Sequence, residues 1–517
     1  MPTDTPPNEI SIRLFDTLTK KKVELRPLEP GHVRLYACGP TVYGDLHLGN
    51  ARPLVTFDLV TRHLRARGLR VTYVRNITDV DDKIIRRAAE LGQTPSELTA
   101  RYAKIFQDNA LELGCQPPTH EPRVTDYVEP IVELIQRLVD KQVAYASEGD
   151  VYFAVDRFAP YGQLSHQPLD ELQAGARVQV GEKKRGPLDF ALWKAAKPGE
   201  PSWPSPWGAG RPGWHIECSA MAEKLLGTSF DIHGGGVDLI FPHHENELAQ
   251  SQGAHGEGTF ARYWMHNGFV NFNGGKISRS DASARVLFDR AFRLAVLFER
   301  HGGETLRWFL LASSYGSPIS YEVSADGEDM ATAQLRFPGL EESEKKAAYA
   351  YETVSRLREQ LAVGKPAGEG PTLDAGEAPG WFTRMGDALD DDFNSAQAFA
   401  ALSEALALCN RILDGKVEAP KDVRRRSLER LDRELRLAAA TLGVLETEPS
   451  VWLAAHRTRR CTARTIDPAV IEAKLLARTE ARKAKDFAAA DLVRDELKAL
   501  GVEIMDTARG TTWKVAD

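Results

Sequence analysis

Apolar and polar positions divide the chain into a first part that alternates strands with helices and a later part that is almost entirely helical. The apolar, β-branched run at 33–36 predicts a strand that ends near Cys38, where a Gly-Pro pair interrupts it. Apolar positions at helical spacing over 54–64 predict a helix, and 69–75 predicts a second strand. This order predicts a parallel, doubly wound α/β domain that binds its ligands at the carboxyl ends of the strands.

An insertion and a long helical part follow this start. Residues 116–210 are predicted to be an insertion, with a strand at 150–155 and a stretch at 198–213 that is too dense in turn formers for regular structure. Further strand patterns occur at 230–236 and 263–272. From about residue 300 the pattern predicts helices only, including a bundle over 381–445, before a C-terminal tail with two short β-forming runs.

Composition narrows the class of protein without naming a function. With 517 residues, 42% hydrophobic and 27% charged, the chain has the composition of a globular protein of three or four domains. No apolar run has the length of a membrane span, and we see no secretory signal, so we expect a cytoplasmic protein. The five cysteines are few and scattered, which suits a reducing compartment. Because the net charge is −7, a nucleic-acid partner requires a local basic surface.

Four side chains that are far apart in sequence form a candidate metal-binding set. Cys38, Cys218, His243 and Glu247 offer two thiolates, an imidazole and a carboxylate, a combination that favours Zn²⁺ over Mg²⁺ or Ca²⁺. His243 and Glu247 share one face of a helix that is predicted to begin at the proline before His243. Whether His243 or the adjoining His244 binds the metal stays open. Such an ion either activates a water molecule or binds a substrate thiol as thiolate.

Three glycine-containing segments are candidates for nucleotide binding. The strand before Cys38 leads through a turn into His47-Leu-Gly-Asn50, which opens a helix, and helix N-termini bind phosphate through free backbone N–H groups. In 274–280, two glycines precede Lys276 and Arg279, whose charges suit a triphosphate. Three glycines at 234–236 follow a predicted strand and are expected to let a ligand approach the backbone closely.

Taken in order, these segments resemble the cysteinyl-tRNA synthetases, a family of class I aminoacyl-tRNA synthetases. The resemblance covers nearly the whole chain. Its motifs are CGPTVY (38–43), HLGN (47–50), RNITDVDDK (75–83), RGPLDFALWK (185–194), GWHIECSAM (213–221), DIHGGG (231–236), FPHHENE (241–247), KISRS (276–280), KDFAAAD (485–491) and GTTW (510–513). The KISRS segment departs from the usual KMSKS signature by Ile277 for Met and Arg279 for Lys.

The resemblance implies a Rossmann-type catalytic domain that activates L-cysteine with ATP and Mg²⁺ and transfers it to the 3′ end of tRNA(Cys). It also implies one Zn²⁺ per chain, and we expect a monomer. The implied divisions are two catalytic halves, an inserted connective domain, a signature-loop and stem-contact region, an α-helical bundle and a small C-terminal α/β tail. They span residues 1–115 and 211–275 for the catalytic halves, then 116–210, 276–335, 336–450 and 451–517 in that order.

The resemblance also implies roles for individual residues. Zinc would be held by Cys38, Cys218, His243 and Glu247 and would bind the substrate thiolate, which selects cysteine over serine. Thr41, Thr78, Trp214 and His233 would line the cysteine pocket. ATP would be contacted by His47 and Asn50, with Lys276 and Arg279 stabilising the transferring phosphates.

Two enzyme functions and one binding function are alternatives. A related cysteine ligase of mycothiol synthesis acts on a sugar amine and shares the zinc site, but it lacks the anticodon-binding tail. A zinc hydrolase would release a hydrolysed product without ATP. A non-catalytic tRNA-binding relative would bind tRNA without activating cysteine.

Overall fold

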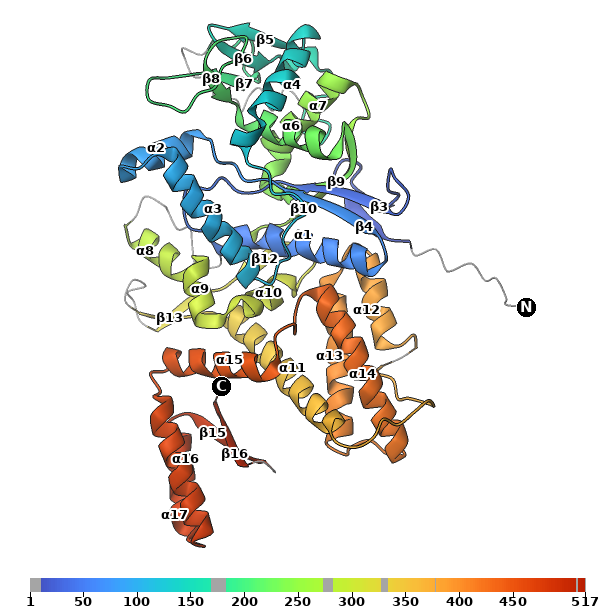
Figure 1. The fold of residues 1–517 in the computed structure, drawn as a ribbon, viewed down its shortest axis with the longest axis vertical. Helices are drawn as coiled ribbons and strands as arrows, with labels where there is room; N and C mark the ends of the chain where they lie inside the picture. The colour runs from blue at the N-terminus through green and yellow to red at the C-terminus, as the bar shows by residue number, and fades with distance from the viewer. Residues whose placement is uncertain are drawn as a thin grey trace, which may run out of the picture.

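We describe the fold from a computed structural model, which covers residues 11–168, 183–272, 282–326, 333–376, 378–507 and 510–516. A four-stranded parallel sheet forms its centre, in the order β10-β9-β3-β4 (Figure 1). Its strands are β3 (His32–Ala37), β4 (Arg70–Arg75), β9 (Ser229–Gly236) and β10 (Phe260–Asn267). Helix α1 (Leu48–Ala66) crosses from β3 to β4, so the predicted parallel, doubly wound domain is confirmed.

The parallel sheet is buried on both faces, as its continuous apolar strands require. On one face, Phe57 of α1 packs with Leu35, Ile232 and Met265 of the sheet. On the other face, Tyr36 and Trp264 pack with apolar side chains of the inserted segment. The carboxyl ends of the parallel strands therefore lie together at one edge of the sheet, where Cys38 follows β3 and Asn76 follows β4.

The inserted segment has its own antiparallel sheet, in the order β5-β6-β7-β8. The sheet and the helices beside it (Figure 1) are β5 (Ala144–Ser147), β6 (Asp150–Phe153), β7 (Phe190–Ala195), β8 (Gly210–Pro212), α4 (Val128–Asp140), α6 (Trp214–Leu226) and α7 (Glu245–His255). The expectation that 198–213 has no regular structure is wrong at β8, which pairs with β7. Gly210 makes this possible, because a Cβ there would lie 2.3 Å from Trp193 Nε1.

Short strands also occur in the part that was expected to be only helical. After β11 (Val270–Phe272) the chain forms helices and then short strands, of which the first pairs with β11 and the next two pair with each other. These elements are α8 (Ala282–Ala291), α9 (Leu294–His301), α10 (Gly303–Leu311), β12 (Ile319–Tyr321), β13 (Ser324–Asp326) and β14 (Gln334–Arg336). Strand β12 pairs in parallel with β11, about 50 residues earlier, so a local apolar pattern does not reveal it.

A helical bundle and a small α/β unit complete the chain, as the sequence predicts. Their elements are α11 (Pro338–Ala362), α12 (Trp381–Asp390), α13 (Ser395–Leu413), α14 (Lys421–Leu442), α15 (Pro449–Ala463), α16 (Pro468–Lys483), α17 (Phe487–Ala499), β15 (Val502–Thr507) and β16 (Gly510–Val515). Near the N-terminus lie β1 (Arg13–Asp16), β2 (Lys21–Glu24), α2 (Asp82–Leu91), α3 (Pro95–Glu112) and the short helices η1 (Val124–Tyr127) and η2 (Val155–Arg157). Among the described helices, none combines the length and the apolar character that crossing a membrane requires.

Candidate functional site

The site begins where β3 and β4 end side by side. Cys38 follows β3 directly, and its backbone N–H donates to the Gly234 carbonyl of β9. Gly39 lies against the chain after β4, because a Cβ at this position would come within 1.7 Å of the Asn76 carbonyl oxygen. The Gly39 N–H also donates to Asn76 Oδ1 at 2.9 Å. A side chain at position 39 would therefore separate Cys38 from the segment that contains Thr78.

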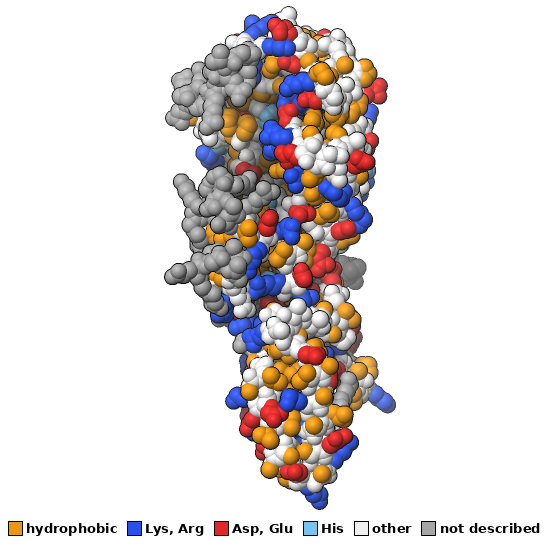
Figure 2. Space-filling model, turned by 90° about the vertical axis from the view of Figure 1, so that its left-hand side faces the viewer, with side chains coloured by type: hydrophobic (Ala, Val, Ile, Leu, Met, Phe, Trp, Pro, Cys, Tyr) orange, Lys and Arg blue, Asp and Glu red, His pale blue; other side chains and the backbone are white. Residues whose placement is uncertain are grey.

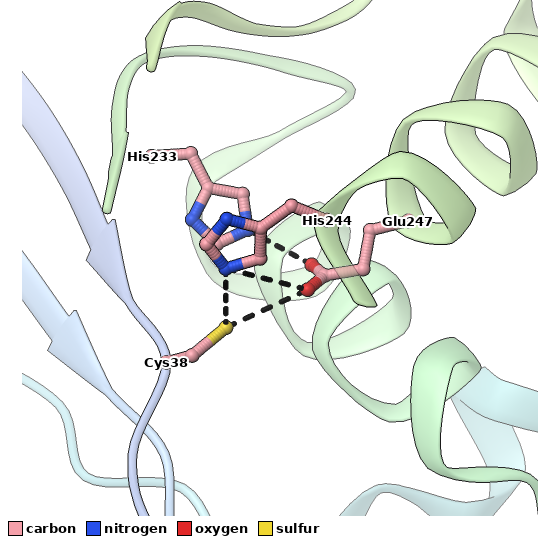
Figure 3. Close-up of side chains that lie close together, drawn as sticks. All are labelled: Cys38, His233, His244 and Glu247. Carbon is pink, nitrogen blue, oxygen red and sulfur yellow. Dashed lines mark hydrogen bonds and ion pairs between the residues drawn. The ribbon is translucent and has the colours of Figure 1, made fainter. Parts of the chain in front are cut away.

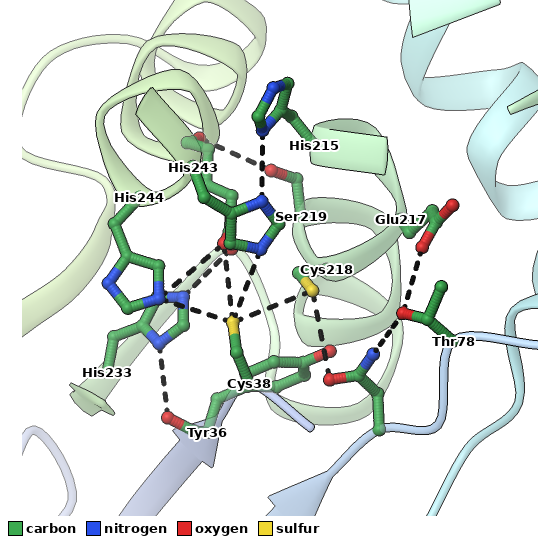
Figure 4. A network of polar contacts seen from close by, with 12 residues as sticks. Tyr36, Cys38, Thr78, His215, Glu217, Cys218, Ser219, His233, His243 and His244 are labelled. Carbon is green, nitrogen blue, oxygen red and sulfur yellow. Dashed lines mark hydrogen bonds and ion pairs between the residues drawn. The ribbon is translucent and has the colours of Figure 1, made fainter. Parts of the chain in front are cut away.

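Helix α6, helix α7 and the turn just before α7 bring three more candidate ligands to Cys38 (Figure 4). Cys38 Sγ lies 3.7 Å from Cys218 Sγ, 3.6 Å from His243 Nε2 and 3.5 Å from Glu247 Oε1. The two thiols are free and form no disulfide. All four donor atoms lie within 4.8 Å of one another. The structure thus brings together the four side chains that the sequence proposes as a metal-binding set.

The spacing of these donors suits tetrahedral zinc. With Zn–S bonds of about 2.3 Å and Zn–N or Zn–O bonds of about 2.0–2.2 Å, tetrahedral angles place two sulfurs about 3.8 Å apart. The same angles place a sulfur about 3.6 Å from a nitrogen or oxygen ligand. The three distances from Cys38 Sγ match these values within about 0.1 Å. The donor set therefore fits zinc in its chemistry and in its distances from Cys38, whereas His243 Nε2 and Glu247 Oε1, 2.9 Å apart, lie about 0.5 Å closer than two ligands of one tetrahedral ion.

A second, overlapping set shares Cys38 and Glu247 with the first. His233 and His244 complete it, and its donor atoms also lie within 4.8 Å of one another (Figure 3). His244 Nε2 is 3.3 Å from Cys38 Sγ, and His233 Nε2 is 2.9 Å from Glu247 Oε2. The other ring nitrogen of His244 lies 2.8 Å from His266 Nε2. Both neighbouring histidines, His243 and His244, are thus close enough to reach the centre.

The start of the predicted helix differs from the structure. Between β9 and α7 the chain forms two short turns of helix, η3 (Val237–Leu239) and η4 (Ile240–His244). Phe241 has extended dihedral angles (φ −136°, ψ 133°), so regular winding begins only at Glu245, three residues after Pro242. This irregular turn is what allows His243 and His244 to approach Cys38 together.

Burial and close contact shift the pKa values of these groups strongly. Burial raises the pKa of the Cys38 thiol, and its hydrogen bond to Cys218 lowers the pKa of Cys218 to about 6. Although burial opposes both changes, the attraction between Glu247 and its histidine neighbours lowers the pKa of Glu247 to about 2 and raises that of His243 to about 10. The centre therefore already contains thiolate and carboxylate character, which is what a cationic metal requires.

The glycines at 234–236 make room for the protein's own side chains. A Cβ at Gly234 would lie 2.1 Å from the Phe57 ring, and one at Gly235 would lie 2.9 Å from the His244 ring. These contacts account for the lack of a side chain at both positions, and the approach of a ligand to the backbone here stays a prediction. They allow β9 to pack against α1 on one side and against His244 on the other.

The four residues expected to bind cysteine have different surroundings. Trp214, 38% exposed, stacks on His243 with ring centroids 4.2 Å apart. Thr78 is buried beside half-buried Thr41, and its hydroxyl donates to Glu217 Oε2 at 3.3 Å. His233 is fully buried, and its Nδ1 lies 3.2 Å from the Tyr36 carbonyl oxygen. Trp214 and His233 thus contact the candidate ligands directly, whereas Thr78 contacts Glu217 beside Cys218 and Thr41 contacts Thr78, and their binding of cysteine stays a prediction.

Sequence reasoning missed several side chains that support this centre. They lie around the ligands in the sheet, just after β4 and on α6, and they are Tyr36, Asn76, His215, Glu217 and His266. His215 Nδ1 lies 3.0 Å from His243 Nδ1, and burial raises the pKa of Glu217. The run from Gly213 to Met221 contained two of these residues beside Cys218, but nothing in its spacing indicated their partners.

His47 and Asn50 lie at the start of α1, as expected. Asn50 Oδ1 accepts a hydrogen bond from the His47 backbone N–H at 3.1 Å, and His47 is the N-cap. The segment also pairs with the chain after α8, since the Leu48 N–H donates to the Phe292 carbonyl. Lys276 and Arg279 lie outside the residues that the structure describes.

Comparison with known proteins agrees with this fold. Residues 24–330 match the model for tRNA synthetases class I (C) catalytic domain, and residues 384–446 match the DALR domain. One similar solved structure is that of Mycobacterium tuberculosis methionyl-tRNA synthetase in complex with methionyl-adenylate, with a TM-score of 0.55 and 16% identity. The match covers 81% of this chain and 92% of the methionyl-tRNA synthetase chain. The fold is therefore that of a class I aminoacyl-tRNA synthetase.

More similar relatives define the family within this class. The cysteine–tRNA ligase of Anaeromyxobacter sp. (strain Fw109-5) is 48% identical over 511 residues, which cover 98% of this chain and 99% of the relative. That of Geobacter sulfurreducens is 44% identical over 507 residues, covering 98% of this chain and all of the relative. Residues 468–513 match the cysteinyl-tRNA ligase anticodon binding domain. The chain belongs to the cysteine–tRNA ligase family, whose members are aminoacyl-tRNA ligases.

Proposed function

We propose that the chain activates L-cysteine with ATP and Mg²⁺ and then esterifies the 3′ end of tRNA(Cys), and that a zinc ion selects the amino acid. The observation that carries this proposal is the convergence of two free thiols, an imidazole and a carboxylate at tetrahedral zinc spacing. The division of the chain after residues 115, 210, 275, 335 and 450 is part of the same proposal.

We assign the zinc ligands to Cys38, Cys218, His243 and Glu247. Cys218 lies at the tetrahedral spacing from Cys38, and thiolates are the softer and more zinc-selective ligands. When bound there, zinc supplies a soft position that prefers a thiolate to a hydroxyl group. An apolar pocket separates such near-identical substrates by only about 1–3 kcal/mol, so a metal–sulfur contact gives far better discrimination.

The remaining cysteine-binding residues have two kinds of role. Trp214, Thr41 and Thr78 line the space around the centre and hold the body of the amino acid. His233 is a positioning residue, because its ring is fully buried and joins Glu247 to the backbone at Tyr36. It fixes the carboxylate that ligates the metal, as hydrogen-bonded partners of metal ligands commonly do.

Adenylation requires positioning and charge neutralisation and needs no covalent nucleophile from the protein. His47 and Asn50 hold the phosphates of ATP at the positive end of α1. Lys276 and Arg279 neutralise the charge that develops on the transferring phosphates. This assignment rests on residue chemistry and on the order of the signature segments.

The helical bundle and the C-terminal unit hold the tRNA. On the face shown in Figure 2, hydrophobic side chains come to the surface at the end of the molecule that carries the C-terminal elements. On α16, Leu476 is 61% exposed, and on α17, Leu492 is 61% and Phe487 63% exposed. Exposed aromatic and apolar side chains among charged ones suit the recognition of unstacked bases. The presence of this unit disfavours the sugar-amine ligase, which lacks it.

Cysteine-dependent exchange of pyrophosphate into ATP tests the proposal. The zinc-loaded protein is expected to catalyse exchange with cysteine and not with serine. It is then expected to charge tRNA(Cys). Hydrolysis without ATP would support the hydrolase, and tRNA binding without any exchange would support the non-catalytic alternative.

A further inference from the structure

Arg52 is a buried cation that the proposed mechanism does not use. It lies on α1 just after Asn50, and its side chain is only 1% exposed. Its guanidinium donates to four backbone carbonyl oxygens in two separate segments. The acceptors are Phe269 at 2.6 Å, Ser314 at 3.2 Å, Tyr315 at 3.1 Å, and Ser317.

Among the described residues, the Arg52 guanidinium has hydrogen bonds only to backbone carbonyl oxygens. Within the described parts of the chain, no carboxylate forms an ion pair with Arg52, and burial lowers its pKa to about 10, so it stays charged at neutral pH. Arg307, which is also fully buried, differs because it pairs with Asp58 besides donating to the Leu442 carbonyl. Burying a cation without a counter-ion costs free energy, which its hydrogen bonds must offset.

The two segments that Arg52 joins lead into β11 and β12. Phe269 immediately precedes β11, Ser317 lies two residues before β12, and the Phe269 carbonyl also accepts from the Ile319 N–H. Gly268 lets the segments meet, because a Cβ there would lie 2.7 Å from the Ser317 carbonyl oxygen. The chain continues from the end of β11 directly into 273–281, which contains Lys276 and Arg279.

The chain after this stretch returns to the same helix start. The Leu48 N–H donates to the Phe292 carbonyl, and the Leu294 N–H donates to the Leu46 carbonyl, both at 2.9 Å. The part of the chain that carries the cationic residues is therefore attached on both sides to the beginning of α1. Arg52 makes the attachment on the β11 side, and backbone pairing makes it on the other.

We propose that Arg52 is a positioning residue for adenylation, which fixes β11 and β12, and with them the chain that leads into residues 273–281, against the helix that begins with His47 and Asn50. The inference rests on the proposed adenylation chemistry. A planar guanidinium reaches acceptors in two segments at once, whereas an ammonium group presents all its donors from one atom. Displacing reacting groups by about 1 Å lowers rates by up to about 10²-fold.

The first test compares Arg52→Lys with Arg307→Lys in zinc-loaded protein. Both variants lose the fork of a buried arginine, but only the first touches the β11–β12 attachment. In pyrophosphate exchange, we expect Arg52→Lys to lower kcat by about 10- to 100-fold relative to Arg307→Lys. The KM for cysteine and the zinc content are expected to stay within twofold of the unmodified protein. Equal kcat in the two variants, or a rise in cysteine KM instead, would overturn the inference.

Gly268→Ala perturbs the same attachment of β11 to β12 independently, and it keeps the inference testable if Arg52→Lys does not fold. Its added methyl group pushes apart the same two segments, so kcat is expected to fall with cysteine KM unchanged. In the Arg52→Lys/Gly268→Ala double variant, we expect the losses to be clearly less than additive. Full additivity, or an unaffected kcat in Gly268→Ala, would contradict the proposal. An unmodified protein without exchange would instead refute the proposed function.

Discussion

Replacing Cys218 by serine separates the two overlapping donor sets around Cys38. The substitution removes one sulfur and leaves a hydroxyl group of similar shape, so packing around this buried position on α6 changes little. Cys218 belongs to the set with His243 but not to the set with His233 and His244. Loss of zinc in Cys218→Ser would therefore show that the set with His243 holds the ion, and retention of zinc would favour the set with His233 and His244.

The size of the effect follows from the number of ligands. A four-ligand protein zinc site has a binding free energy of about 10–16 kcal/mol, or about 2.5–4 kcal/mol for each ligand if the ligands contribute equally. Losing the Cys218 thiolate, which lies 3.7 Å from Cys38 Sγ, should therefore weaken zinc binding by roughly 10²–10³-fold. Because the substrate thiolate binds the same ion, the KM for cysteine should rise together with the loss of zinc.

The assay measures zinc content after dialysis against a chelator, together with the KM for cysteine in pyrophosphate exchange. Cys409→Ser is the matched control, since Cys409 is a fully buried free thiol on α13 that belongs to neither donor set. It should retain zinc. Retention of zinc by Cys218→Ser, with loss of zinc in His244→Gln, would refute the assignment and favour the second set.

Two further predictions concern the triphosphate and the helical part. Arg279→Ala should slow adenylation in pyrophosphate exchange with little change in the cysteine KM, and a pure rise in that KM would contradict the role. The imidazoles of His301 and His456 lower the pKa of buried Glu344 from its usual 4.5 to about 2, although burial opposes this shift. The Glu344 carboxylate therefore stabilises the fold above pH 4.5, and this stabilisation is lost as the pH falls towards 2. The free energy of unfolding of Glu344→Gln, measured with urea, should be lower than that of the unmodified protein by about 3 kcal/mol at pH 5 and by less at pH 3; a difference independent of pH would exclude this ion pair as its cause.

Local patterns in the sequence predicted the framework of the catalytic domain well. The apolar run before Cys38 and the helical spacing after Asn50 are signals that lie within one element, and β3, α1 and β4 follow them. The four candidate metal ligands could also be picked out, because two thiols, an imidazole and a carboxylate form an unusual combination of donors, and the structure brings them together. The sequence could not show whether His243 or His244 is the metal ligand, because an irregular turn brings both rings to Cys38.

Structural features that depend on residues distant in sequence could not be predicted from local patterns. Strand β12 is recognisable only through its pairing with β11, and β8 only through its pairing with β7. Gly234 and Gly235 look like a site for ligand approach, but their neighbours are the rings of Phe57 and His244. Arg52 appears in sequence as an ordinary helical arginine, because its acceptors lie more than 200 residues away.

In the proposed centre, two protein sulfurs hold a zinc ion that accepts a third sulfur from the substrate. X-ray absorption at the zinc edge counts sulfur ligands directly, at a Zn–S distance of about 2.3 Å. For the zinc-loaded protein, we expect two sulfur ligands without substrate and three after addition of cysteine, with no increase after addition of serine. A single sulfur ligand in the free protein, or a count that cysteine leaves unchanged, would contradict it.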